Sequence, residues 1–206
     1  YERIFFHSAK NLIGKATMEK YQGVKFRHQR TKPTFDYDHR LVSLNRWAYL
    51  FSQLGLTPVH TDGDTVGAYG NHSYRTGDRS FVITKAAMVP AEILQLDNFC
   101  HIVDFNEKPP TFITEGASIP SSESFLHNAL YQTQPHINAI LHGHCSLLNI
   151  HAESLNIPIT QKFHDYGTPE LAQSALDLVD QTTLFFILRD HGFVALGEDI
   201  GSAGRM

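Results

Sequence analysis

The sequence predicts a single α/β domain, and three observations support that prediction. The chain has 206 residues, 42% of them hydrophobic, which suits one globular domain with a sizeable core. Apolar runs of strand length recur, for example at residues 80–84, 99–105 and 184–188. Segments with apolar residues at helical spacing lie between such runs, notably residues 40–54 and 169–181. Strands and helices are therefore interleaved along one chain.

The first predicted element is a helix over residues 40–54. Its apolar positions recur at helical spacing, and Gly55 follows where a glycine commonly ends a helix. After a polar, turn-rich segment at residues 57–64, the pattern predicts a strand at 65–69. This first helix is expected to pack against the core.

The middle of the chain predicts a short helix, a loop and a longer helix. Residues 88–96 favour a short helix that begins near Pro90. Residues 106–119 contain two prolines and a glycine and predict a loop. Residues 119–131 begin with a proline and paired serines suited to a helical first turn, and their apolar side chains share one helical face.

The last third alternates strands and helices again. Residues 137–145 are an apolar strand, and residues 147–155 and 169–181 are predicted helices. Two short strands follow, joined by a turn at His191. Residues 201–204 contain two glycines and predict no helix.

Charge and cysteine content limit the class of protein. Residues 1–40 hold nine Lys or Arg against four Asp or Glu, a net charge of +5, so the remainder carries −9. A basic arm could bind nucleic acid, but these cations stand singly among apolar residues, so we favour a solvated or subunit-contacting extension. No apolar run approaches the ~20 residues of a membrane span, and no signal-peptide pattern is visible. Two cysteines, Cys100 and Cys145, indicate a reducing cytoplasm.

Two histidines at the end of the apolar strand predict a metal site. His142 and His144 are separated by one residue, so in a strand they project from the same side. His191 supplies a third ligand if its turn abuts that strand. Three imidazoles leave a coordination position open, as in a catalytic metal site. The alternative is that they are ordinary surface or core histidines, which are more common.

The predicted helix at 119–131 offers a second group of polar side chains. A helix N-terminus has unpaired N–H donors, so Ser121 and Ser122 could hold a phosphate or a carboxylate. Glu123 lies in the same turn. The alternative to a functional role is that Glu123 only complements the helix dipole.

Four motifs in order resemble those of the class II aldolase/adducin family: G-N-x-S-x-R at residues 70–75, P-S-S-E at 120–123, the H-G-H run at 142–144 and H-G-F-V-A-L-G-E-D at 191–199. The resemblance covers roughly residues 41–200. It implies a three-layer α/β/α domain with a mostly antiparallel central sheet at residues 41–206, preceded by a basic N-terminal extension at residues 1–40. It also implies a homotetramer with sites between subunits.

The resemblance also implies the roles of individual residues. His142, His144 and His191 match the ligands of a divalent metal, normally Zn²⁺, and Glu123 matches the catalytic acid/base. The substrate phosphate would contact Asn71, Ser121 and Ser122. The sugar-phosphate aldolases have a Thr-Gly pair where this chain has Ala86 and Ala87.

The predicted function is that of a zinc-dependent aldolase, a lyase of carbohydrate metabolism. It would cleave or form a carbon–carbon bond in a ketose phosphate or related hydroxy-ketone through a metal-stabilised enediolate. Two alternatives stay open. The same site would serve a sugar-phosphate epimerase or dehydratase, and a non-catalytic adducin-like module is the third class.

Overall fold

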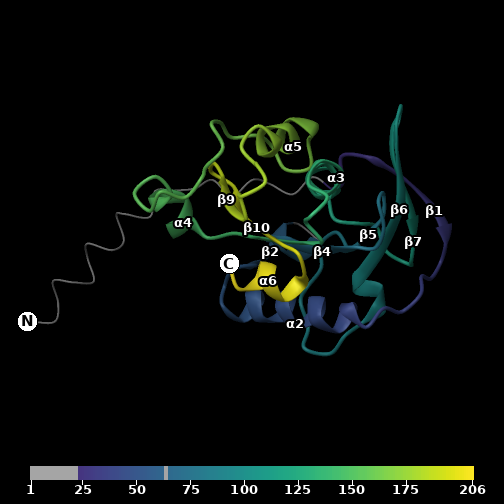
Figure 1. The fold of residues 1–206 in the computed structure, drawn as a ribbon. Coiled ribbons are helices and arrows are strands. Elements are labelled where there is room, and N and C mark those ends of the chain that lie inside the picture. Colours follow the sequence, from purple (N-terminus) through teal and green to yellow (C-terminus); the bar gives the residue numbers. More distant parts are fainter. Residues whose placement is uncertain (1–22, 63–64) are drawn as a thin grey trace, which may run out of the picture.

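A computed structural model describes residues 23–62 and 65–206 (Figure 1). Eight strands form the main sheet: β1 (Arg27–Lys32), β4 (Asn71–Arg75), β5 (Phe81–Thr84), β6 (Phe99–Glu107), β7 (Pro110–Glu115), β8 (Ala139–Gly143), β9 (Phe185–Leu188) and β10 (Gly192–Gly197). Their order is β1-β7-β6-β5-β4-β8-β10-β9. Neighbouring strands are antiparallel except β1 and β7, which are parallel. The predicted α/β fold with a mostly antiparallel sheet is confirmed.

The remaining elements are helices and one small hairpin. The helices are α2 (Arg40–Gln53), α3 (Ser124–Thr133), α4 (Ser146–His151), α5 (Pro169–Leu176), α6 (Ile200–Gly204) and the short 3₁₀ helix η2 (Leu96–Asn98). The hairpin is β2 (Val59–Asp62) with β3 (Thr65–Ala68). In Figure 1, α3 and α5 lie on one side of the sheet, and α2 and α6 on the other. No helix among the described residues is long and apolar enough to cross a membrane.

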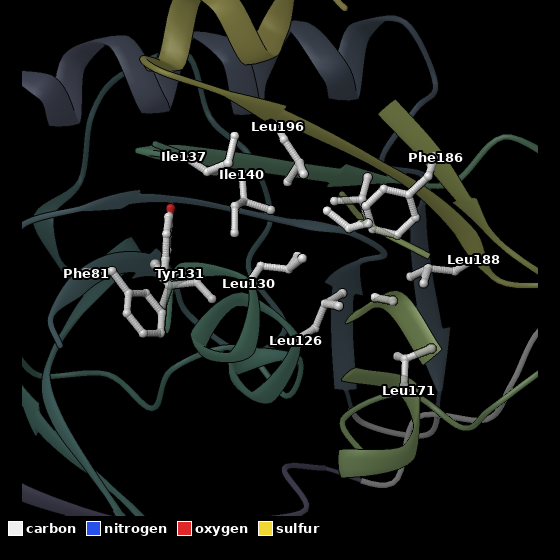
Figure 2. Close-up of a cluster of buried hydrophobic side chains, with 14 of the residues drawn as sticks. Phe81, Leu126, Leu130, Tyr131, Ile137, Ile140, Leu171, Phe186, Leu188 and Leu196 are labelled. Carbon is white, nitrogen blue, oxygen red and sulfur yellow. The ribbon is translucent and has the colours of Figure 1, made fainter. Parts of the chain in front are cut away.

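Each face of the sheet has its own hydrophobic core. Figure 2 shows the core under α3 and α5, where Leu130 and Leu171 pack with Ile140 and Phe186. Leu141, the next residue along β8, belongs to the core on the opposite face, with α2 and α6. This alternation follows from the strand period of two. Each fully buried side chain of this size contributes roughly 1.5–3 kcal/mol, so the two cores hold the three layers together.

Two predictions for the middle of the chain are wrong. Residues 88–96 form no helix; only the 3₁₀ turn η2 begins at their end. The carbonyls of Ala91 and Glu92 accept the side-chain amide of Asn45 at 3.0 and 3.1 Å. These two carbonyls therefore bind a side chain of α2 and are not used in helical hydrogen bonds. The predicted loop at residues 106–119 contains strand β7, which pairs with both β6 and β1.

The chain also ends in a helix that the sequence did not predict. Helix α6 begins with a capping box, in which Asp199 and Ser202 each accept the other's backbone N–H. Gly204 lies against Trp47, because an added Cβ would meet that ring at 2.4 Å. Capping and packing therefore outweigh the poor helix propensity of its glycines.

Strand β1 brings part of the basic N-terminal segment into the sheet. It pairs in parallel with β7, and all but one of its residues are exposed. Basic side chains on an edge strand discourage pairing with another sheet. Residues 1–22 lie outside the described part of the chain, so the division into an extension at 1–40 and a domain at 41–206 stays a prediction.

Gly70 holds the start of β4 against the end of β8, and its replacement should be costly. Its φ is +93°, and an added Cβ would lie 2.6 Å from the carbonyl oxygen of His142. Gly55 has a φ of +72° with nothing within 4 Å of an added Cβ. In urea unfolding, Gly55→Ala should therefore lower the free energy of unfolding only by the cost of placing alanine in a left-handed backbone conformation, roughly 1–2 kcal/mol. Gly70→Ala should lower the free energy of unfolding by more than this. An equal loss in the two variants would contradict the close approach of Gly70 to the His142 carbonyl.

Candidate metal centre and cavity

Three histidines converge at one end of the sheet. His142 is the last residue but one of strand β8 and His144 follows that strand, whereas His191 lies in the turn between β9 and β10. Strand β10 pairs with β8 so that Val194 lies opposite His142, and this register brings the turn to the end of β8. One ring nitrogen from each histidine lies within 4.8 Å of the other two. The condition set by the sequence, that the His191 turn abuts β8, is met.

The tautomer of His142 is fixed by a backbone contact. Its Nδ1 lies 2.7 Å from the carbonyl oxygen of Phe193. A carbonyl only accepts hydrogen bonds, so Nδ1 carries the proton. In the neutral ring, Nε2 then has a lone pair that faces the other histidines. Orientation of a ligating histidine by a carbonyl is typical of metal sites.

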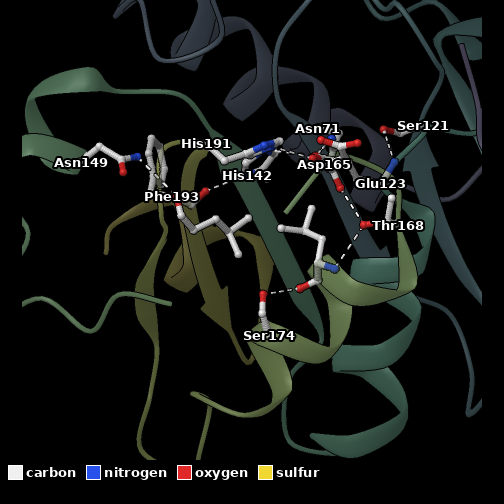
Figure 3. A network of polar contacts seen from close by, with 12 residues as sticks. Asn71, Ser121, Glu123, His142, Asn149, Asp165, Thr168, Ser174, His191 and Phe193 are labelled. Carbon is white, nitrogen blue, oxygen red and sulfur yellow. Dashed lines mark hydrogen bonds and ion pairs between the residues drawn. The ribbon is translucent and has the colours of Figure 1, made fainter. Parts of the chain in front are cut away.

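Glu123 lies directly beside these histidines. Its Oε1 is 2.7 Å from His191 Nε2, and its Oε2 is 3.1 Å from His142 Nε2. Asn71 Nδ2 donates to Oε2 at 2.6 Å. Figure 3 shows these side chains gathered at one place from α3, β4, β8 and the β9–β10 turn. A buried carboxylate is therefore positioned by an amide and faces two of the three imidazoles.

The electrostatics of the cluster follow from burial and mutual charge. Burial would raise the pKa of Glu123, but His142 and His191 hold the pKa of this carboxyl well below its usual range. Burial would lower the pKa of His142, but the Glu123 carboxylate raises it. Burial and the two other histidines lower the pKa of His144. Glu123 is therefore ionised and His144 neutral.

The residues fit a divalent metal by the chemistry of their donors. Three buried or half-buried imidazoles, with ring centroids 4.9–5.2 Å apart, would repel one another if all were protonated. Neutral rings at this spacing are instead suited to share one cation, and three histidine ligands with an open position are typical of catalytic zinc. The nearby carboxylate adds a negative charge that favours a cation further.

A cavity of about 350 Å³ opens beside the histidines. Asn71, Ser121, Ser122 and Glu123 all line it, together with His144 and His191. Ser121 Oγ accepts the backbone N–H of Glu123 at 3.4 Å. Ser122 Oγ donates to the carbonyl of Gly23 at 3.4 Å. His142 is buried behind the cavity wall. The predicted site residues are thus brought together in and around one cavity.

Helix α3 begins later than the sequence predicted. Its N-cap is Glu123, so Ser121 and Ser122 precede the helix in a turn. The backbone N–H of Ser121 donates to the carbonyl of Thr84 at 3.1 Å. The serines therefore lie where the end of β5 meets the start of α3.

The sequence alone did not place several aromatic residues at the cavity wall. Tyr69 stacks on His60 with ring centroids 3.9 Å apart, and its ring centroid lies 5.2 Å from that of His144. Tyr166 and Phe163 also line the cavity, and Tyr166 donates to the carbonyl of Gly23 at 3.2 Å. The only sequence signal was their aromatic character, because each reaches the cavity through a loop or the small hairpin.

Two further buried histidines, His72 and His127, should make stability depend on pH. Burial lowers the pKa of each to about 3. The unfolded chain binds a proton at each below pH ~6.5 and the folded protein does not, so stability falls as the pH falls below that value. Each histidine contributes a slope of up to about 1.4 kcal/mol per pH unit.

Urea unfolding between pH 6.5 and 5 measures this effect. His72→Leu should remove up to one proton from the difference between the unfolded and folded states, and so flatten the dependence of the unfolding free energy on pH. His151→Leu, at an exposed position in α4, should leave this dependence unchanged. An unchanged slope in His72→Leu would show that His72 is protonated in the folded protein.

The family of the chain follows from a comparison of its sequence with protein families. The model described as the Class II Aldolase and Adducin N-terminal domain matches residues 57–206, which include all the predicted site residues. The chain belongs to the class II aldolase/adducin family. The class II aldolases of this family are enzymes that generally use a divalent metal, in keeping with the three converging histidines.

Relatives within the class II aldolase/adducin family carry two kinds of name. A methylthioribulose-1-phosphate dehydratase of Yersinia enterocolitica is 27% identical over 164 residues, covering 66% of this chain and 74% of the relative. An L-fuculose phosphate aldolase of Methanococcus maripaludis is 30% identical over 152 residues, covering 67% and 78%. A solved L-fuculose 1-phosphate aldolase superposes with a TM-score of 0.62 at 20% identity, covering 82% and 80%, and shows the shared fold.

Proposed function

We propose that this protein is a metal-dependent aldolase that cleaves or forms a carbon–carbon bond in a hydroxy-ketone. The substrate would be a ketose phosphate or a related sugar. The observation that supports this proposal most is the position of Glu123, 2.7 Å from His191 and 3.1 Å from His142, beside a cavity of about 350 Å³.

In the proposed mechanism, His142, His144 and His191 hold a divalent cation, most often Zn²⁺ in such sites. The cation would supply a Lewis acid for the negative charge that develops on the substrate. In bond formation, Glu123 would remove the proton from the carbon beside the substrate carbonyl. In cleavage, Glu123 would return a proton to that carbon, and the hydroxyl that becomes the aldehyde would lose its proton to solvent. Asn71 keeps the Glu123 carboxylate in place through its 2.6 Å hydrogen bond.

A dehydratase is the second candidate, and one observation favours it. The dehydratase of Yersinia enterocolitica is among the relatives and matches 66% of this chain. Removal of a proton beside a carbonyl also begins the loss of water from a neighbouring carbon, so Glu123 and the histidines would serve either reaction. The fate of the substrate distinguishes them, because an aldolase releases an aldehyde and a dehydratase releases water.

A substrate screen tests the proposed function. The metal-loaded protein would be mixed with ketose phosphates and free hydroxy-ketones, and aldehyde release, water loss and exchange of the C–H proton with solvent would be recorded together. Proton exchange with aldehyde release supports the aldolase, and exchange with water loss supports the dehydratase. Absence of exchange with every substrate, in protein that holds one metal per chain, would overturn both.

The proposal includes assembly as a homo-oligomer, a tetramer as implied by the family resemblance. Leu147 and Ile150 on α4 are 68% and 61% exposed, and Leu147 lines the cavity. Phe163, 43% exposed, lies at the same cavity. Apolar side chains at a cavity mouth are suited to contact a neighbouring subunit. Light scattering of the purified protein measures the assembly.

A further inference from the structure

One cationic side chain lines the cavity, and the proposed mechanism does not use it. Lys85 follows β5 and forms an antiparallel bridge with Pro120, directly before the two serines. Among the cavity-lining residues in the described part of the chain, Lys85 is the only lysine or arginine. Its side chain forms no ion pair or hydrogen bond with any described residue. Lys85 is therefore available to a ligand.

The strand register places Lys85 away from the histidines and on the same face of the sheet. Asn71 pairs with His142 across β4 and β8, so both side chains face α3. Ser73 pairs with Ile83 across β4 and β5, and Lys85 lies two residues beyond Ile83 on the same face. Two strand spacings separate the backbones of His142 and Lys85 laterally, about 10 Å. A ligand that spans the cavity would meet the metal site at one end and a cation at the other.

Most groups that could hold a phosphate near Lys85 are already engaged. A phosphate monoester presents three acceptor oxygens and a charge of about −1.5 to −2. Three of the backbone N–H groups nearby, those of Lys85, Ala86 and Ser121, donate to carbonyls at 2.9–3.1 Å. Ala86 and Ala87 supply no hydroxyl. Ala87 has a φ of +52°, in the left-handed region that favours glycine.

The side chains expected to bind phosphate are engaged as well. The Asn71 amide donates to Glu123 at 2.6 Å, and its buried Oδ1, with no hydrogen-bond partner among the described residues, is an acceptor that would repel an anion. The Ser122 hydroxyl donates to the carbonyl of Gly23. Among these side chains, Lys85 and the Ser121 hydroxyl remain as donors. One lysine charge and one hydroxyl match the single charge and two oxygens of a carboxylate better than a phosphate dianion.

We propose that Lys85 determines substrate specificity by pairing with a carboxylate, so that the substrate is a hydroxy-ketone with a carboxylate at its far end. This inference rests on the proposed function, because the other end of the substrate must reach the histidine site.

Binding of three compounds to the zinc-loaded protein tests this proposal. All three carry a hydroxamate, which chelates zinc, and they differ in the far end: a carboxylate, a phosphate or a hydroxyl. Calorimetry should show the carboxylate compound binding at least tenfold more tightly than the hydroxyl compound, and the phosphate compound no more tightly than the carboxylate one. Lys85→Met should remove the preference for carboxylate and leave the affinity for the hydroxyl compound unchanged.

Two control variants separate charge from structure. Lys85→Arg keeps the charge and should keep the carboxylate preference within a few-fold, even if Lys85→Met folds poorly. Lys108→Met, at an exposed lysine between β6 and β7, should change nothing. Tightest binding of the phosphate compound, or an unchanged carboxylate preference in Lys85→Met, would overturn the role of Lys85 and leave the proposed function intact. Failure of all three compounds to bind would instead overturn the proposed function, and the carboxylate site with it.

Discussion

Replacing Glu123 with glutamine is expected to reduce kcat by about 10²–10⁴-fold, the usual contribution of a positioned acid or base. The side chain keeps its shape, so the Glu123→Gln protein should still bind one metal per chain. Glutamine cannot take a proton from carbon, and it also removes the negative charge beside His142 and His191. Turnover of the substrate found in the screen, with metal content by elemental analysis, measures both expectations.

Glu153→Gln is the matched control for this prediction. Glu153 is exposed and pairs with Arg189 at 3.2 Å, away from the cavity lining. Its replacement should leave kcat within about twofold, as expected for a surface ion pair. A Glu123→Gln protein that keeps more than a tenth of wild-type kcat would show that another group moves the proton.

Replacing His191 with alanine is expected to weaken metal binding by more than about 100-fold, because even groups that only orient a ligand contribute roughly 10–100-fold. The variant would leave two imidazoles, from His142 and His144, and a cation with two ligands is not held in a fixed geometry. Competition with a chromophoric chelator measures the affinity. Turnover should fall together with the metal content.

His151→Ala serves as the control for the metal prediction. His151 ends helix α4 and is exposed, outside the group of three converging histidines. Its removal should leave affinity and turnover unchanged. If His191→Ala bound metal as tightly as the wild type, the third ligand would have to be another residue and the arrangement of the site would be wrong.

Much of the fold was predictable because local patterns and tertiary packing agree. Helix α2 occupies nearly the whole predicted range 40–54, since its apolar stripe is also its buried face. Prediction failed where distant contacts decide the structure. Strand β7 begins at Pro110, the second of two consecutive prolines, and its pairing partners β6 and β1 cannot be recognised from local sequence. The carbonyls of residues 91 and 92 are used by Asn45, so the expected helix there does not form.

The candidate site also contains residues that local sequence could place and residues that only distant strand pairing places. The spacing of His142 and His144 predicted their convergence, because one strand carries both. His191 needed the register of β8 with β10, which the sequence suggests only through motif order. Lys85 and Tyr69 could not be placed from the sequence, because each reaches the cavity through the pairing of separate segments.

The hydrogen bond from His142 to the carbonyl of Phe193 has a mechanical consequence. The hairpin of β9 and β10 carries His191 in its turn and, two residues later, the carbonyl that orients His142. A cation held by His142, His144 and His191 would therefore add a second link between β8 and this hairpin, beside that hydrogen bond. Chelation of the ion should loosen the hairpin as one unit, and amide hydrogen exchange in β10 should quicken along with the loss of binding.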